Sequence, residues 1–148
     1  MSVRWKKYLW QEPLPATPRD IARLEQAWGV VLPENYKQVI AAHQGMVPIP
    51  STFRVGRGSD SVGPFLTLSP DPRWGNTYSA LSIHEEFKSF LPEGVYPFAT
   101  TPGGEYLCFD YRDATGDPRI VFMTVEATLL PVAEDFTHLL RSLYDSEA

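Results

Sequence analysis

Cysteine and histidine are scarce in this sequence of 148 residues. Cys108 is the single cysteine, so the chain cannot form an intrachain disulfide or a zinc site built from several cysteines. The three histidines are scattered, and no two have a spacing typical of paired metal ligands. We therefore expect no metal ion and no cofactor, and the cysteine content does not demand an oxidising compartment.

Long apolar runs are also missing. No stretch approaches the roughly 20 apolar residues of a membrane-spanning helix, and the N-terminal segment holds no apolar run of signal-peptide length. We therefore expect a soluble, cytoplasmic protein without a membrane partner. Apolar residues make up 43% of the chain and aromatic residues 13%, which is enough to fill a core. The length suits one domain over residues 1–148.

Positive charge is in short supply, and it is unevenly distributed. The formal net charge is −5, and residues 105–148 carry nine acidic and three basic side chains. An acidic surface repels nucleic-acid phosphates and attracts a basic partner, so we expect a protein partner and no nucleic acid. A solvated face that keeps the protein in solution is the competing interpretation of the same charge.

Capping signals predict helices near both ends of the chain. Residues 17–20 form a capping box with proline at the first helical position, and Gly29 ends that helix. A proline predicts the start of a second helix over residues 33–43. An apolar stripe predicts a last helix over residues 132–144, and residues 5–9 favour a short first helix.

Short strands and turns are expected in the middle of the chain. Residues 52–56 and 65–69 alternate as strands do, with a turn or hairpin loop at residues 56–63. Residues 119–125 are apolar on both faces, as in a central strand. A capping box at residues 82–85 predicts a short helix. Its expected inner face consists of Ile83, Phe87 and Phe90. The predicted fold is α+β, a mostly antiparallel sheet flanked by an N-terminal helix pair and a C-terminal helix.

One segment has the composition of an active-site loop. Residues 100–112, TTPGGEYLCFDYR, join a glycine turn to a thiol, two carboxylates and two tyrosines. On a strand, Glu105 and Asp110 face opposite sides, with Asp110 expected on the solvent side, so these polar groups cannot converge on one reacting atom. Cys108 lies between large apolar residues, where cysteine is usually buried. We interpret the segment as a turn that leads into a strand, and an enzyme that uses Cys108, Asp110 or His43 is an alternative.

A set of residues across the chain matches a known family pattern. The matching residues are the Leu-Glu pair at residues 24–25, Gly29, the Leu-Pro-x-x-Tyr at residues 32–36, Gly45, Gly104, Glu105, Phe136 and Leu140. In this pattern, over about residues 18–143, the chain resembles the SUKH superfamily, which includes the yeast cell-wall assembly regulator and many bacterial immunity proteins. Gln44 stands where the family often has asparagine, and Glu105 where it often has aspartate.

The resemblance implies a binding module without a catalytic centre. Many bacterial members are immunity proteins that bind and neutralise a cognate toxin, often a nuclease. We therefore expect a protein that neutralises a toxin domain, with a regulatory scaffold like the fungal members as the alternative and a small hydrolase as a third possibility. The expected partner-binding residues are aromatic and acidic side chains: Glu105, Tyr106, Asp110, Asp113, Asp117 and Trp74.

Overall fold

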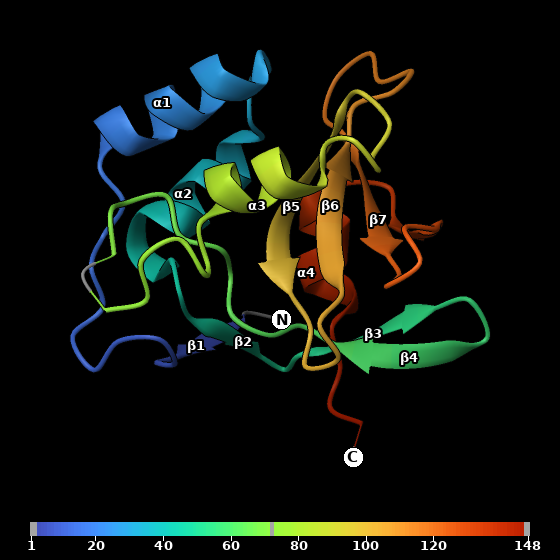
Figure 1. The fold of residues 1–148 in the computed structure, drawn as a ribbon. Helices are drawn as coiled ribbons and strands as arrows, with labels where there is room; N and C mark the ends of the chain where they lie inside the picture. The colour runs from blue at the N-terminus through green and yellow to red at the C-terminus, as the bar shows by residue number, and fades with distance from the viewer. Residues whose placement is uncertain (1–2, 72, 147–148) are drawn as a thin grey trace.

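A four-stranded antiparallel sheet forms the centre of the molecule in a computed structural model that describes residues 3–71 and 73–146 (Figure 1). The strands follow one another along the chain and across the sheet: β5 (Val95–Thr100), β6 (Tyr106–Asp110), β7 (Arg119–Met123) and β8 (Leu129–Ala133). The apolar segment at residues 119–125 therefore supplies a central strand, as predicted. The α+β fold expected from the sequence is confirmed.

Two small antiparallel sheets correct the predictions for the first half of the chain. β1 (Arg4–Lys6) pairs with β2 (Val47–Ile49), so residues 5–9 do not form the expected helix. Pairing with a distant strand and stacking of Trp5 on His43, with ring centroids 4.9 Å apart, outweigh the local helical pattern.

The second small sheet is a hairpin. β3 (Thr52–Val55) was expected, and β4 (Gly58–Ser61) occupies half of the segment predicted as a turn or hairpin loop. The hairpin turns through two residues only, because Gly56 adopts a φ of 56° that suits such a tight connection. The strand predicted at residues 65–69 is reduced to single bridges.

The two N-terminal helices are present as predicted. The capping box of α1 (Pro18–Trp28) is formed, since Thr17 Oγ1 accepts from Asp20 N at 3.1 Å and Thr17 N donates to Asp20 Oδ2 at 3.0 Å. Gly29 ends α1 with a φ of 69°. Glu25 then joins α1 to α2 (Glu34–His43), because its Oε2 accepts from the backbone of Leu32 in the link at 2.8 Å and lies 3.1 Å from Nζ of Lys37 in α2.

The other two helices begin at different residues from those predicted. α3 (Ala80–Phe87) starts earlier, because Ser79 Oγ caps it by accepting from Ser82 N at 3.2 Å. α4 (Phe136–Ser142) starts later than position 132, because Asp135 caps it and the preceding apolar residues pair with β7 as the edge strand β8. A proline in β8 is compatible with that edge position.

The two faces of the four-stranded sheet are unequally covered. On one face, rings from α2 and α4 pack on the sheet: Tyr36 and Phe136 contact Phe109 with centroids 4.9 and 6.2 Å apart, and Phe98 stacks on Phe109 at 4.3 Å. The other face carries a small separate cluster formed by Leu91, Val95, Cys108, Val121 and Met123. Three partly buried residues pack against the margin of that cluster: Phe87, Tyr106 and Leu129.

Candidate functional site

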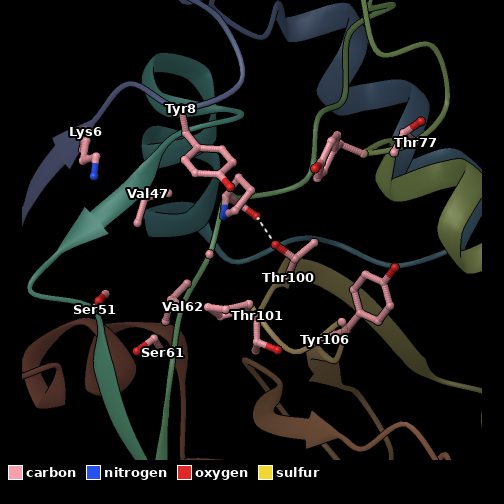
Figure 2. Close-up of a pocket in the computed structure, with 15 residues that line it drawn as sticks. Lys6, Tyr8, Val47, Ser51, Ser61, Val62, Thr77, Thr100, Thr101 and Tyr106 are labelled. Atoms are coloured by element: carbon pink, nitrogen blue, oxygen red, sulfur yellow. Dashed lines mark hydrogen bonds between the residues drawn. The ribbon is translucent and has the colours of Figure 1, made fainter.

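An open groove of about 520 Å³ runs beside the glycine turn between β5 and β6 (Figure 2). Figure 2 shows Lys6, at the end of β1, and Tyr8, just after it, on one side of the groove and Thr100 and Tyr106 on the other. The groove therefore joins segments that are almost one hundred residues apart in the sequence. Thr100 Oγ1 donates to the backbone oxygen of Pro64 at 3.2 Å and so holds the strand end to the segment at the base of the groove.

Hydroxyl groups dominate the chemistry of the groove. Among the described residues that line it, Lys6 is the one with a formal charge. The lining residues with hydroxyl groups are Tyr8, Ser51, Ser61, Thr77, Tyr78, Thr100, Thr101 and Tyr106. Hydroxyl groups both donate and accept hydrogen bonds, so this surface suits polar contacts with a protein partner.

The glycine turn is held in one conformation by its own hydrogen bonds. Thr101 N donates to the Glu105 backbone oxygen at 2.9 Å, and Thr101 Oγ1 donates to Glu105 Oε1 at 2.6 Å. Gly104 has a φ of 84°, and a Cβ on Gly103 would lie 2.5 Å from Glu105 Oε1. The two glycines thus have separate roles. Gly104 supplies the positive backbone angle, and Gly103 leaves space for the Glu105 carboxylate. Residues 100–112 form a turn that leads into a strand, as interpreted from the sequence.

A second pocket, of about 410 Å³, lies on the other side of Tyr106. Gly104 and Tyr106 line both hollows, so the tyrosine separates the hydroxyl-lined groove from this pocket. Phe90 and Val125 also line the pocket, and their exposed fractions are 69% and 72%. Phe90 was expected on the inner face of a helix. That prediction is wrong, because α3 ends at Phe87 and the chain turns away before position 90.

Asp110 is buried at the opposite end of β6, which corrects its expected place on the solvent side. Its carboxylate accepts from Arg112 Nε at 3.0 Å and Nη2 at 3.1 Å, and from Arg119 Nη2 at 3.0 Å. Burial opposes ionisation, but the hydrogen bonds from Arg112 and the charges of both arginines outweigh it and lower the pKa of Asp110. The Asp110 side chain is 0% exposed, so a partner cannot reach its carboxylate.

Asp113 and Asp117 lie together in the turn between β6 and β7, and both are exposed. They line an open surface hollow in which four acidic side chains accompany two arginines. This turn follows the end of β6 that is furthest from Tyr106, so it cannot share one compact site with Glu105. The structure thus divides the predicted partner-binding residues between two ends of the sheet.

Trp74 lies close to the groove but does not line it. Its Nε1 donates to the backbone oxygen of Leu9 at 3.0 Å, and its ring meets the Tyr78 ring edge-on at 5.5 Å. Tyr78 and Tyr8 line the groove and were missed by the sequence analysis. Tyr8 was assigned to a helix, whereas it is 59% exposed. No local pattern marks these tyrosines, since only the tertiary fold brings them together.

The candidate catalytic residues occupy separate environments. Cys108 is fully buried, and burial followed by the negative charge of Asp110 raises the pKa of its thiol. His43 stacks on Trp5, whereas His84 packs edge-on against Trp28 with ring centroids 5.8 Å apart. Burial lowers the pKa of both imidazoles. Within residues 3–71 and 73–146, no three metal-ligating side chains gather closely enough to hold a metal ion.

The sequence profile of the SMI1 / KNR4 family (SUKH-1) matches residues 15–142. The chain belongs to this family. A comparison with curated proteins finds no match. No helix in the described part of this SUKH-1 chain is long and apolar enough to cross a membrane.

Most residues by which the chain resembles the SUKH superfamily support the fold. Glu25 joins the first two helices, and Tyr36 is fully buried among the aromatic rings of the core. Gly45 has a φ of 74° and allows close approach of the Leu9 side chain, since an added Cβ would lie 3.3 Å from it. The glycine–acid step differs, because Gly104 lines both the groove and the second pocket. This step is therefore where the SUKH-1 pattern meets the candidate binding surface.

Proposed function

We propose that this SUKH-1 protein is a non-catalytic immunity protein that binds and neutralises a cognate toxin domain. The observation that carries the proposal is the concave surface at the glycine turn, where three tyrosines and several smaller hydroxyl groups surround a groove. Tyrosine is a common anchor in protein interfaces, because its ring buries a large area and its hydroxyl makes a directed hydrogen bond.

The rigidity of the turn supports the same function. Hydrogen bonds from Thr101 to Glu105 fix the loop before a partner arrives. A surface that is ordered in the free protein loses less conformational entropy on binding, which favours affinity. Tyr106 begins the strand that follows this turn and is therefore presented from a regular element.

The charge distribution indicates the kind of toxin. Asp113 and Asp117 line a surface hollow together with Glu134 and Asp135, and these four carboxylates outnumber the two arginines of the hollow. Such a surface accelerates the encounter with a basic protein and repels nucleic acid. A toxin with a basic nucleic-acid-binding cleft, such as a nuclease, fits both properties. We propose that Asp113 and Asp117 steer the encounter, whereas Tyr106 and Glu105 contact the bound toxin together with Trp74.

Co-expression with toxin domains encoded by neighbouring genes tests this proposal. One of them should arrest growth alone, lose its toxicity when this chain is present, and form a stable complex with it. Tyr106→Ala should weaken the complex while circular dichroism shows a retained fold. Failure of every neighbouring toxin to be neutralised or bound would contradict the proposal. A stable complex with a housekeeping protein would favour the regulatory scaffold instead.

A further inference from the structure

The pocket beyond Tyr106 exists because the second face of the central sheet is incompletely covered. α3 has eight residues and lies against β5 in Figure 1, with β7 further from it. At a rise of about 1.5 Å per residue, a helix of this length cannot extend over the whole sheet. The small apolar cluster on this face therefore has an open margin, which is bordered by Phe87 and Tyr106.

Apolar side chains from separate turns project around this margin. Phe90 follows α3 and Val125 lies in the turn after β7, yet both line the same pocket while remaining largely exposed. The Phe87 and Tyr106 rings lie 5.7 Å apart and form another part of its wall. Exposed apolar groups that share one hollow are typical of a surface that another molecule covers.

Carboxylates around the pocket indicate the charge of that molecule. Glu126 lines the pocket. Glu86 is exposed in α3 directly before Phe87, which lines the pocket, and its negative charge, after the larger effect of burial, raises the pKa of the Tyr106 phenol. The nearby Lys88 is paired with Glu85, with 2.6 Å between Nζ and Oε1. A positively charged segment would therefore meet uncompensated negative charge here, whereas a second copy of this chain, at a net charge of −5, would be repelled overall.

We infer that the pocket receives an apolar side chain from a basic segment of the partner protein. Tyr106 and Phe90 enclose that side chain, and lysine or arginine residues beside it pair with Glu86 and Glu126. The inference rests on the proposed protein-binding function and specifies the part of the toxin that this surface recognises. The adjoining hydroxyl-lined groove would then accept polar groups from the same segment.

A titration with short peptides tests the pocket without knowledge of the toxin. The probe is acetyl-Lys-Lys-Leu-Trp-Lys-Lys-amide, and the comparison peptide replaces each lysine with glutamate. Amide chemical shifts of the full chain, followed by NMR, should change at residues 86–90, 104–106 and 123–127 with the basic peptide. The acidic peptide should bind at least about tenfold more weakly, because like charges then face each other.

Matched variants assign the effect to the pocket. Val125→Ser and Phe90→Ser should each weaken binding of the basic peptide by about tenfold, since both remove apolar contact area without adding charge. Val31→Ser is the apolar control, because Val31 is 77% exposed in the link between α1 and α2. Glu126→Lys should also weaken binding. Glu93→Lys should not, because Glu93 precedes the start of β5, whereas Tyr106 pairs with the other end of that strand.

Each result has a defined meaning. Shift changes outside the three segments, equal binding of the acidic peptide, or unchanged affinity for Val125→Ser would overturn the inference. Self-association that Val125→Ser abolishes would also overturn it, because the occupant would be a second copy. A toxin complex that tolerates Val125→Ser would contradict the pocket but leave the proposed function intact. Peptide binding at the pocket without any toxin complex would contradict the proposed function instead.

Discussion

Asp110 on β6 and Arg119 on β7 lie directly opposite each other, and Oδ2 of the aspartate is 3.0 Å from Nη2 of the arginine. Arg112 completes the arrangement from the turn that follows β6, through three hydrogen bonds to the same carboxylate. A buried charge is stable only when it is paired and hydrogen-bonded. The Asp110 carboxylate therefore fixes the start of the turn that carries Asp113 and Asp117, here called the acidic turn, to the sheet.

Replacing Asp110 with asparagine should lower the free energy of unfolding by about 1 to 3 kcal/mol at neutral pH. The lowered pKa of Asp110 also gives a pH dependence. The ionised Asp110 carboxylate adds its full stabilisation to the folded state above the unfolded-state pKa of about 3.9. This stabilisation is lost as pH falls through the pKa of the folded state. Urea unfolding should therefore show a steeper loss of stability below about pH 5 for the wild type than for Asp110→Asn. Asp117→Asn, an exposed carboxylate in the same turn, should keep the wild-type slope; equal slopes for all three proteins would refute this role.

Reversing two charges in the acidic turn should slow association with the toxin. The double variant Asp113→Lys and Asp117→Lys removes the local attraction for a basic partner, so the association rate should fall by about tenfold at low ionic strength. The dissociation rate should change little, because this turn is far from Tyr106. Stopped-flow measurements at several salt concentrations check both statements. An association rate that is unchanged at low salt would remove the steering role.

The two glycines of the turn should respond differently to alanine. Gly104→Ala should cost about 1 to 2 kcal/mol of stability, because a side chain is strained at a φ of 84°. Gly103→Ala should cost less, since the Glu105 side chain can move, but it should disturb the bond from Thr101 to that carboxylate. Gly116→Ala is the control, because an added Cβ meets nothing within 4 Å at Gly104 or at Gly116, whereas the φ of Gly116 lies outside the left-handed range. Equal thermal stabilities for the Gly104 and Gly116 variants would contradict this account.

The hydroxyl of Tyr36 should contribute no stability. It is buried in the aromatic core and has no hydrogen-bond partner among the described residues. Tyr36→Phe should therefore leave the free energy of unfolding unchanged or raise it by up to about 1 kcal/mol. Tyr96→Phe is the matched control, since the Tyr96 hydroxyl donates to the Trp28 backbone oxygen at 3.0 Å and its loss should cost about 1 kcal/mol. A larger loss for Tyr36→Phe than for Tyr96→Phe would show that the Tyr36 hydroxyl does have a stabilising partner.

The thiol of Cys108 should be unreactive in the folded protein. It is 0% exposed, and burial raises its pKa, so both access and the thiolate form are suppressed. Titration with a disulfide reagent should give one thiol per chain in denaturant and a far slower reaction without it. A fast reaction in the native state would revive the hypothesis that Cys108 is a nucleophile.

Local signals in the sequence predicted the elements that depend on short-range contacts. The capping box at residues 17–20 and the proline before α2 act over three or four residues, so they can be identified without the fold. β1 could not be predicted, because it depends on pairing with residues more than forty positions away. The start of α4 was misplaced for a similar reason, since Val132 has helical spacing with Phe136 but lies in β8, which pairs with β7.

The candidate site was only partly predictable. Glu105 and Tyr106 were proposed as binding residues because the glycine turn and the strand are adjacent in the sequence. Tyr106 lines the groove, whereas the Glu105 carboxylate accepts from Thr101 within the turn. Asp110 was placed on the wrong side, because alternation along a strand does not show that two arginines bury and neutralise a carboxylate. Phe90 and Val125 were not identified as part of a surface, since their proximity arises from the end of a short helix and a distant turn.

Glu25 and Tyr36 hold the framework together, and they are separate from the turns around Tyr106. This separation has an evolutionary consequence. Apart from Gly103 and Gly104, substitutions in those turns can change the binding surface at little cost to the free energy of unfolding, because the interior is anchored elsewhere. Under the proposed function, an immunity protein built in this way can follow sequence changes in its toxin. Grafting the turns of one SUKH-1 member onto the framework of another is then a direct route to a new pairing.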